Sequence, residues 1–166
     1  MSRSLTNQAG TRSETTTDVW LTPPNIIQTL GTFDLDPCAA CNRPWDTAQN
    51  HYCVHDDGLR QRWEGFVWCN PPYGREIAMW LNKMARHGNG IALIFARTDT
   101  KAFQKYVLHG ADSILFLAGR IKFYRPDGIS SGNSAGAPSC LVAYGKQAVN
   151  RLENSGLQGK HVLLHY

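Results

Sequence analysis

The sequence predicts a three-layer α/β fold built on a mostly parallel sheet. Four short apolar runs are continuous rather than alternating in polarity, which is typical of strands covered on both faces. Amphipathic patterns lie between them, and strands that alternate with helices indicate a sheet with helices on both sides. The four runs are residues 65–69, 90–96, 113–117 and 139–144.

The chain is expected to begin with a flexible segment and to continue as one domain. Residues 1–17 are polar and rich in Ser and Thr, a composition typical of disorder. Residues 18–166 have the size of a single ordinary domain. Pro23 and Pro24 follow Thr22, which predicts a helix with Thr22 as its N-cap and proline in its first turn.

The other elements follow from local patterns. Residues 32–35 and 51–54 are short candidate strands that precede the four apolar runs. A helix with one apolar face is indicated by the i, i+3, i+4, i+7 spacing of Ile77, Trp80, Leu81 and Met84. Weaker patterns predict helices over 103–107 and 147–154 and a last strand over 161–166.

The composition excludes a membrane protein and permits a nucleic-acid partner. Lys and Arg total 17 against 13 acids, a formal charge of +4, which allows binding to nucleic acid without establishing it. No apolar run approaches the roughly 20 residues of a membrane span, and the N-terminus lacks the apolar stretch of a signal peptide. The five cysteines then favour reduced thiols in a cytoplasmic protein.

A zinc site is an alternative use for part of the cysteine set. Cys38-x2-Cys41 and His51-x-Cys53-x-His55 supply the right ligand types, but without the paired spacing of a zinc motif. We therefore expect no metal, and the zinc alternative stays open.

Polar residues follow three of the candidate strands. Asp36 comes after 32–35, Asp56 and Asp57 after 51–54, and Asn70 after 65–69. Ligands bind at the carboxyl ends of strands in open α/β sheets. If these strands are neighbours, two acids and an amide converge on one site.

The stretch Asn70-Pro71-Pro72-Tyr73 suits a planar ring that carries an amino group. The Asn70 side chain offers a carbonyl acceptor, the Pro71 carbonyl offers a second, and two prolines stiffen the backbone between them. Two fixed acceptors match the two N–H donors of an amine, and Tyr73 supplies a face for stacking. A base would have to be flipped out of its duplex to reach such a site.

These residues resemble a known family. Asn-Pro-Pro-Tyr at 70–73 resembles the catalytic motif of adenine-N6 DNA methyltransferases, and "TPPNIIQTLGTFDLDPCAA" at 22–40 resembles the cofactor segment of their gamma type. The order W-x-T-P, D-x-D-P-x-A, D-G-L, W-x-G, N-P-P-Y over 20–144 is similar to the small Dam-like enzymes of phages and prophages, as is "GRIKFYRP" at 119–126. The resemblance implies a compact class I methyltransferase-like (Rossmann-like) fold in a single methyltransferase domain, acting in the cytoplasm of a bacterial host.

The resemblance also implies the reaction and the site. A methyl group would pass from S-adenosylmethionine to the N6 amine of a flipped adenine in DNA by in-line attack. Asp36 would hold the methionine ammonium with Thr22 near its carboxylate, and Asp57 or its neighbour Asp56 would bind the cofactor's adenine. The residues implied to bind and orient the target adenine are Asn70, Pro71, Pro72 and Tyr73, and those implied to bind the cofactor are Thr22, Pro23, Asp36, Pro37, Cys38, Ala39, Asp57 and Asn70.

The chain departs from the family pattern in one region. The glycine-rich turn usual after the first acid is missing, since residues 38–42 read Cys-Ala-Ala-Cys-Asn. Only 34 positions separate Asp36 from Asn70, so the βα unit that carries a ribose-binding acid is expected to be trimmed.

Double-stranded DNA is the expected partner, with no membrane and no obligate protein partner. Arg120, Lys122 and Arg125 follow a strand end beside the Gly/Ser/Pro loop 125–138, and we expect them to face phosphates. There is no room for a separate recognition domain, so loops such as 120–138 are expected to read a short site. Two alternatives remain: methylation of another amine in RNA or protein, and an inactive relative that binds DNA or cofactor.

Overall fold

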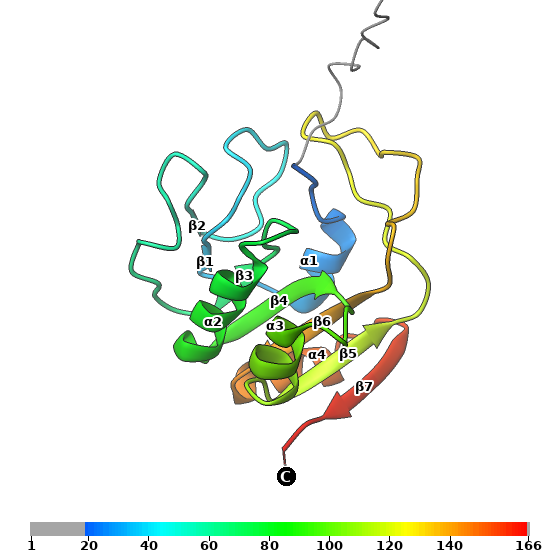
Figure 1. Cartoon of the computed structure of the whole chain (residues 1–166). Helices are drawn as coiled ribbons and strands as arrows, with labels where there is room; N and C mark the ends of the chain where they lie inside the picture. Colours follow the sequence, from blue (N-terminus) through cyan, green and yellow to red (C-terminus); the bar gives the residue numbers. More distant parts are fainter. Residues whose placement is uncertain (1–18, 166) are drawn as a thin grey trace, which may run out of the picture.

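The computed structural model describes residues 19–165, which contain one seven-stranded sheet (Figure 1). The expected flexible segment 1–17 lies outside these residues. The strand order is β2-β1-β3-β4-β6-β5-β7. The strands are β1 (Leu35–Asp36), β2 (Asn50–His51), β3 (Val67–Cys69), β4 (Gly90–Phe95), β5 (Ser113–Leu117), β6 (Ser139–Tyr144) and β7 (Gly159–Leu163).

The sheet is parallel in its first half and antiparallel in its second. β2, β1, β3 and β4 pair in parallel. β6 is antiparallel to β4 and to β5, and β7 is antiparallel to β5. The prediction of a mostly parallel sheet is therefore correct for β1 to β4 and wrong beyond them, because the loop 118–138 returns the chain to the same edge and inserts β6 between β4 and β5.

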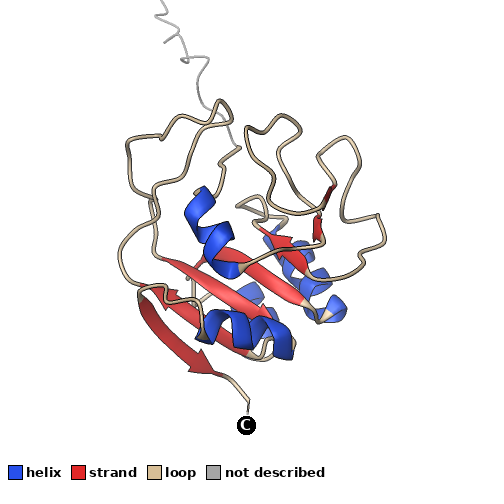
Figure 2. Cartoon of the chain, turned by 180° about the vertical axis from the view of Figure 1, so that it is seen from behind, coloured by secondary structure: helices blue, strands red, loops and turns tan. Residues whose placement is uncertain are grey.

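Helices cover both faces of the sheet, which confirms the three layers. On one face, α1 (Pro24–Leu30) and α4 (Lys146–Glu153) pack on a cluster that includes Trp68 and Leu141 (Figure 2). On the other face, α2 (Ile77–His87), α3 (Lys101–Phe103) and the π-helical segment η1 (Gln104–Leu108) pack on Val67 and Val142. β4 and β6 are buried almost throughout, as their continuous apolar sequences predict.

Two helix predictions need correction. Residues 103–107 do not form one α-helix, because α3 ends at Phe103 and the chain continues as η1. Thr22 is not the N-cap of α1: Pro23 holds that position, with Pro24 at the first helical residue. Extended backbone at Pro23 sets the start of the helix, and the hydroxyl of Thr22 instead accepts a hydrogen bond from Asn70.

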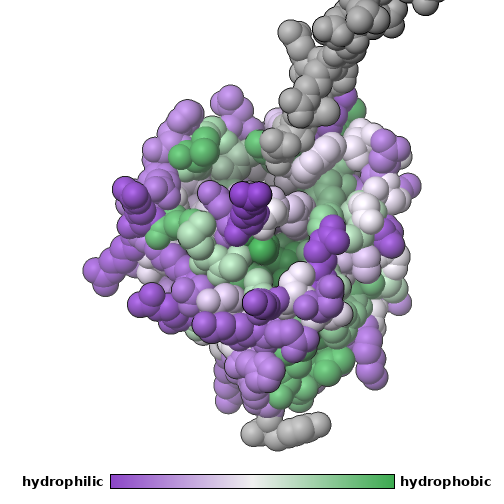
Figure 3. All heavy atoms as spheres, in the orientation of Figure 1, coloured by the Kyte–Doolittle hydropathy of each residue, from purple (hydrophilic) through white to green (hydrophobic). Residues whose placement is uncertain are grey.

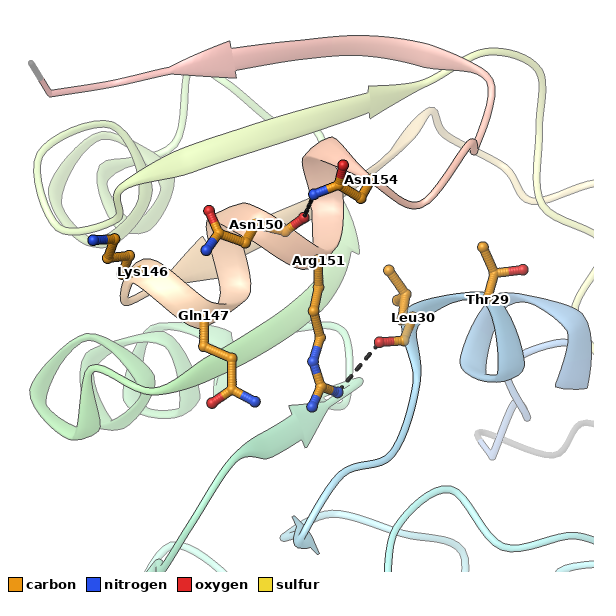
Figure 4. A pocket seen from close by; sticks show the side chains of 7 residues that line it. All are labelled: Thr29, Leu30, Lys146, Gln147, Asn150, Arg151 and Asn154. Carbon is orange, nitrogen blue, oxygen red and sulfur yellow. Dashed lines mark hydrogen bonds between the residues drawn. The ribbon is translucent and has the colours of Figure 1, made fainter.

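Arg151 of α4 fastens the two helices of one face together. Its guanidinium donates to the carbonyl of Leu30 at 3.2 Å and to that of Thr32, and it lies 4.1 Å from the ring centroid of Phe66. A cavity of about 590 Å³ lies between α1 and α4 beside this contact (Figure 4). Because Leu30 precedes β1 whereas Asp36 ends it, this cavity lies toward the opposite end of the strand from the predicted site.

The chain between β1 and β3 contains no helix, as the trimmed unit predicts. Residues 37–49 and 52–66 are irregular apart from turns, and each connection is long enough to join parallel strands. A disulfide between Cys41 and Cys53, whose Cα atoms lie 5.0 Å apart, joins the two connections across β2. The prediction of five reduced thiols is therefore wrong for this pair; Cys38, Cys69 and Cys140 are free.

The surface seen in Figure 3 is mainly hydrophilic, with smaller apolar areas between the polar side chains. No helix within residues 19–165 is both long enough and apolar enough to cross a membrane.

Candidate active site

The ends of β1 and β3 bring Asp36 and the Asn70 segment together. The two strands are neighbours, with Leu35 beside Val67. Cys38 connects them: its backbone N–H donates to Asp36 Oδ1 at 3.1 Å, and its thiol donates to the Asn70 carbonyl at 3.2 Å. The condition set by the sequence, that these two strands are neighbours, is therefore met. Cys69, the last residue of β3, is buried, and its sulfur lies 3.7 Å from the sulfur of Cys38.

Asp36 is a buried carboxylate with few partners. Only 4% of its surface is exposed, and its contacts are the N–H of Cys38 and the hydroxyl of Thr47. Burial raises the pKa of Asp36 to about 6, against which the Thr47 and Cys38 hydrogen bonds and the charge of Arg43 act. Such a group gains most from a cationic partner, because the charged form lacks solvation.

The Asn70 side chain is held in one orientation by the N-terminal segment. Its amide nitrogen donates to the carbonyl of Trp20 at 3.4 Å and to the hydroxyl of Thr22 at 3.2 Å. A backbone carbonyl can only accept, so the nitrogen must face Trp20. The amide oxygen, Oδ1, is then buried and has no hydrogen-bond partner among the described residues. The site therefore contains an oriented acceptor without a donor.

Tyr73 lies over the end of the adjacent strand. Its ring stacks on Phe95, the last residue of β4, with centroids 4.0 Å apart and planes 7° apart. Burial raises the pKa of Tyr73, and the thiols of Cys140 and Cys38 add to the effect, so the hydroxyl stays neutral. Tyr73 is still 37% exposed, so part of the residue is open to solvent.

The acids at 56 and 57 do not join this cluster through their side chains. β2 ends at His51, so the acids follow a turn rather than a strand. Asp57 is exposed, has a φ of 53°, and pairs with Arg60 at 3.3 Å. Asp56 accepts from the N–H of Cys53 at 2.8 Å. The expected meeting of two acids and the amide is thus observed for Asp36 and Asn70 only.

The backbone of the same turn does reach the strand end. A Cβ on Gly58 would lie 1.8 Å from the carbonyl oxygen of Pro37, so only glycine allows this approach. The Asp57-Gly58 turn is therefore packed directly beside the segment that follows Asp36.

Two of the three basic residues after β5 are exposed on an anchored segment. Ile121 and Phe123 are buried, whereas Arg120 and Lys122, which alternate with them, are exposed. Both basic residues border a cavity of about 390 Å³ that also touches α1. Arg125 differs, since it pairs with Asp127 at 2.9 Å and its Nε is buried without a partner among the described residues.

This basic segment is connected to Asn70 through the N-terminal strand residue Leu21. Leu21 and Tyr124 exchange two backbone hydrogen bonds, of 2.8 and 3.0 Å. Tyr124 also packs edge-on against Trp45, with centroids 5.2 Å apart. One continuous set of contacts thus joins the loops 41–48 and 120–131 to the residues that orient Asn70.

Sequence reasoning missed Thr47, Phe95 and the carbonyl of Trp20. No motif marks Thr47, which reaches Asp36 only because the loop after β1 folds back. Phe95 lies near the end of the predicted strand 90–96, and this position is the one signal that could have marked it. The zinc alternative loses Cys41 and Cys53 to their disulfide, and residues 19–165 contain no group of three or more side chains able to hold a metal.

Comparison with known proteins agrees with the chemistry of the Asn70 segment. The sequence model of a family described as DNA N-6-adenine-methyltransferase (Dam) matches residues 9–153. Searches of curated proteins and of solved structures gave no match. Because the family match covers most of the chain, this protein belongs to the DNA N6-adenine-methyltransferase (Dam) family and is an adenine-specific DNA methyltransferase.

Proposed function

We propose that the protein methylates the N6 amine of an adenine flipped out of double-stranded DNA, with S-adenosylmethionine as methyl donor. The observation that carries this proposal is the buried Oδ1 of Asn70, which lacks a donor while its amide nitrogen is held by Trp20 and Thr22. An amine placed there would satisfy this acceptor, and the Pro71 carbonyl would be the second one. Tyr73 would stack on the base.

Asp36 and its neighbours fit the ammonium end of the donor. A buried carboxylate with a raised pKa and two hydrogen bonds retains lone pairs for a cation. Thr22, Pro23, Pro37, Cys38 and Ala39 would form the rest of this subsite, with Asp57 contacting the donor's adenine. When bound, S-adenosylmethionine would supply an electrophilic methyl group for in-line attack by the amine; S-adenosylhomocysteine would leave as a neutral thioether, and the methylated amine would lose one proton to solvent.

The protein's contribution to the reaction is positional and electrostatic. Asn70 and Pro71 would hold the amine and stabilise the positive charge that develops on it during attack. The two acceptors fix the direction of the nitrogen lone pair. Pro72 would keep the backbone between Pro71 and Tyr73 rigid.

The finer description of the fold follows the same proposal. Helices on both faces of a sheet that begins as four parallel strands support a compact class I methyltransferase-like domain spanning residues 18–166. Exposed Arg120 and Lys122 would face DNA phosphates, with Arg125 tying down the loop that follows. The resemblance to phage and prophage enzymes supports a bacterial host cytoplasm as the place of action.

The test is to incubate the protein with methyl-labelled S-adenosylmethionine and unmethylated duplex DNA, RNA or protein, and then to digest the product. Label in N6-methyladenine from DNA is expected. Label in RNA or protein instead would assign another amine as substrate. Intact cofactor binding without any labelled product would favour an inactive relative.

A further inference from the structure

Phe95 has no role in the proposed function, yet its ring stacks on that of Tyr73 in the Asn70 segment. Its ring lies parallel to that of Tyr73, with centroids 4.0 Å and planes 7° apart. Phe95 is the last residue of β4, and there the strand pairs with Ser139 of β6. Tyr73 lies in the loop between β3 and α2, so a ring from the loop rests on a ring fixed by the sheet.

The loop that carries Tyr73 offers little other support for its ring. Gly74 follows with a φ of 124°, and a Cβ there would meet no atom within 4 Å. Pro72 on the other side is exposed. Within the described residues, Phe95 is the only ring that stacks on Tyr73.

The stack leaves no room for a base between the two rings. A flat ring inserted between them would need about twice the 4.0 Å separation, because stacked rings lie roughly 3.5–4 Å apart. The exposed part of Tyr73 is therefore where a base can contact its ring without moving the chain.

We propose that Phe95 is a positioning residue for base capture: it backs the ring of Tyr73, so that the flipped adenine completes a stack of Phe95, Tyr73 and base. This inference rests on the proposed function, in which Tyr73 stacks on the adenine. Arg97 extends the arrangement, with its guanidinium carbon 5.6 Å from the centroid of Phe95.

The role is chemically specific, because a backing residue needs a flat face and not only volume. Phe95→Leu keeps an apolar side chain at the end of β4 but removes the face. Phe95→Tyr restores it. Phe116→Leu is the matched control, since Phe116 is also a half-buried phenylalanine late in a strand, β5, but does not stack on Tyr73.

The experiment uses a duplex in which 2-aminopurine replaces the methylated adenine, whose position is first mapped in DNA methylated by the wild-type protein. Fluorescence of this duplex reports unstacking of the base, and kcat/KM measured separately on the unmodified duplex, which keeps the adenine, reports capture. Phe95→Leu is expected to lower the fluorescence gain and kcat/KM by about three- to tenfold, the contribution of one aromatic pair. Phe95→Tyr should stay within about twofold of wild type, as should Phe116→Leu, and cofactor affinity should not change.

Tyr73→Leu separates the two levels of the argument. Phe95 acts through Tyr73, so the Tyr73→Leu/Phe95→Leu double variant should be no worse than Tyr73→Leu alone. Loss in Tyr73→Leu with wild-type behaviour in Phe95→Leu would overturn the role of Phe95 and leave the proposed function intact. An unaffected Tyr73→Leu would remove the stacking role itself. A higher fluorescence gain in Phe95→Leu would also overturn the inference, since Phe95 would then compete with the base.

Discussion

The side-chain amide of Asn70 donates to the hydroxyl of Thr22 at 3.2 Å, across 48 positions of the chain. This contact, with the Trp20 carbonyl, decides which end of the amide faces the site. An Asn side chain that rotated by half a turn would present N–H groups to an incoming amine, and two donors repel. Residues 20–22 are therefore part of the candidate active site as well as the connection to α1.

Replacing Thr22 by Val should slow methyl transfer by about three- to tenfold, because one of two hydrogen bonds that orient Asn70 is lost. Initial rates of labelled methyl incorporation into DNA measure this. Thr22→Ser keeps the hydroxyl and should stay within about twofold of wild type. Equal rates for the Val and Ser variants would show that the Trp20 carbonyl alone orients the amide.

Asp36 should make the protein less stable as the pH rises through its pKa. The pKa is about 6 in the folded chain against 3.8 as the ordinary value, so the folded state binds the proton more tightly. The stabilising contribution of the neutral carboxyl is complete below pH 3.8 and is lost as the pH rises through about 6. The Asp36→Asn side chain cannot ionise. The unfolding free energy of this variant, relative to that of wild type, should therefore rise by up to about 3 kcal/mol between pH 4 and pH 8.

Urea denaturation at several pH values measures that difference, and calorimetry with S-adenosylmethionine supplies the second readout. The Asn variant should bind the donor much more weakly at pH 8 although it is no less stable than wild type. A pH-independent stability difference would mean that burial does not penalise the charged carboxylate. Unchanged donor affinity would remove Asp36 from the cofactor subsite.

Reducing the Cys41–Cys53 disulfide should lower the unfolding free energy by about 3 kcal/mol, because the bridge closes a short loop across 12 positions. Denaturation with and without a thiol reductant measures the change. The Cys41→Ser/Cys53→Ser variant is the control: its unfolding free energy should match that of the reduced wild type and should be the same with and without the reductant. Identical curves for oxidised and reduced wild type would show that the bridge contributes nothing to stability.

Neutralising Arg120 and Lys122 together should weaken DNA binding to a similar degree for all sequences. Each phosphate contact contributes about 0.9 to the slope of log K against log salt, so the slope should fall by about 2. Lys160→Gln in β7 removes one exposed charge elsewhere and should leave the slope almost unchanged. A slope equal to wild type in the double variant would place the DNA on another surface.

Local patterns predicted the layers and most elements well. The apolar runs at 113–117 and 139–144 coincide with β5 and β6, because continuous apolar sequence has few alternatives to a buried strand. The stripe Trp80, Leu81 and Met84 is the buried face of α2. The meeting of the ends of β1 and β3 was expected only on the condition that these strands are neighbours, and the pairing of Leu35 with Val67 meets that condition.

What the sequence could not predict depends on contacts between distant segments. The antiparallel insertion of β6 is decided by where a long loop returns, and the Cys41–Cys53 bridge by how close an irregular loop brings its ends. The support of Asp36 by Thr47 and of Tyr73 by Phe95 likewise arises only after folding. Asp57 was misplaced because a turn, not a strand, precedes it.

The central claim is that the oxygen of Asn70 receives the amine of the target adenine. The most direct measurement is methyl transfer to DNA by Asn70→Ala, with S-adenosylmethionine affinity measured in parallel. Asn89→Ala is the control, because it removes another side-chain amide. That amide donates to the carbonyl of Gly65, near the starts of β3 and β4. We predict a loss of at least about 100-fold in turnover for Asn70→Ala with donor affinity retained. Turnover close to that of wild type in Asn70→Ala would contradict the claim.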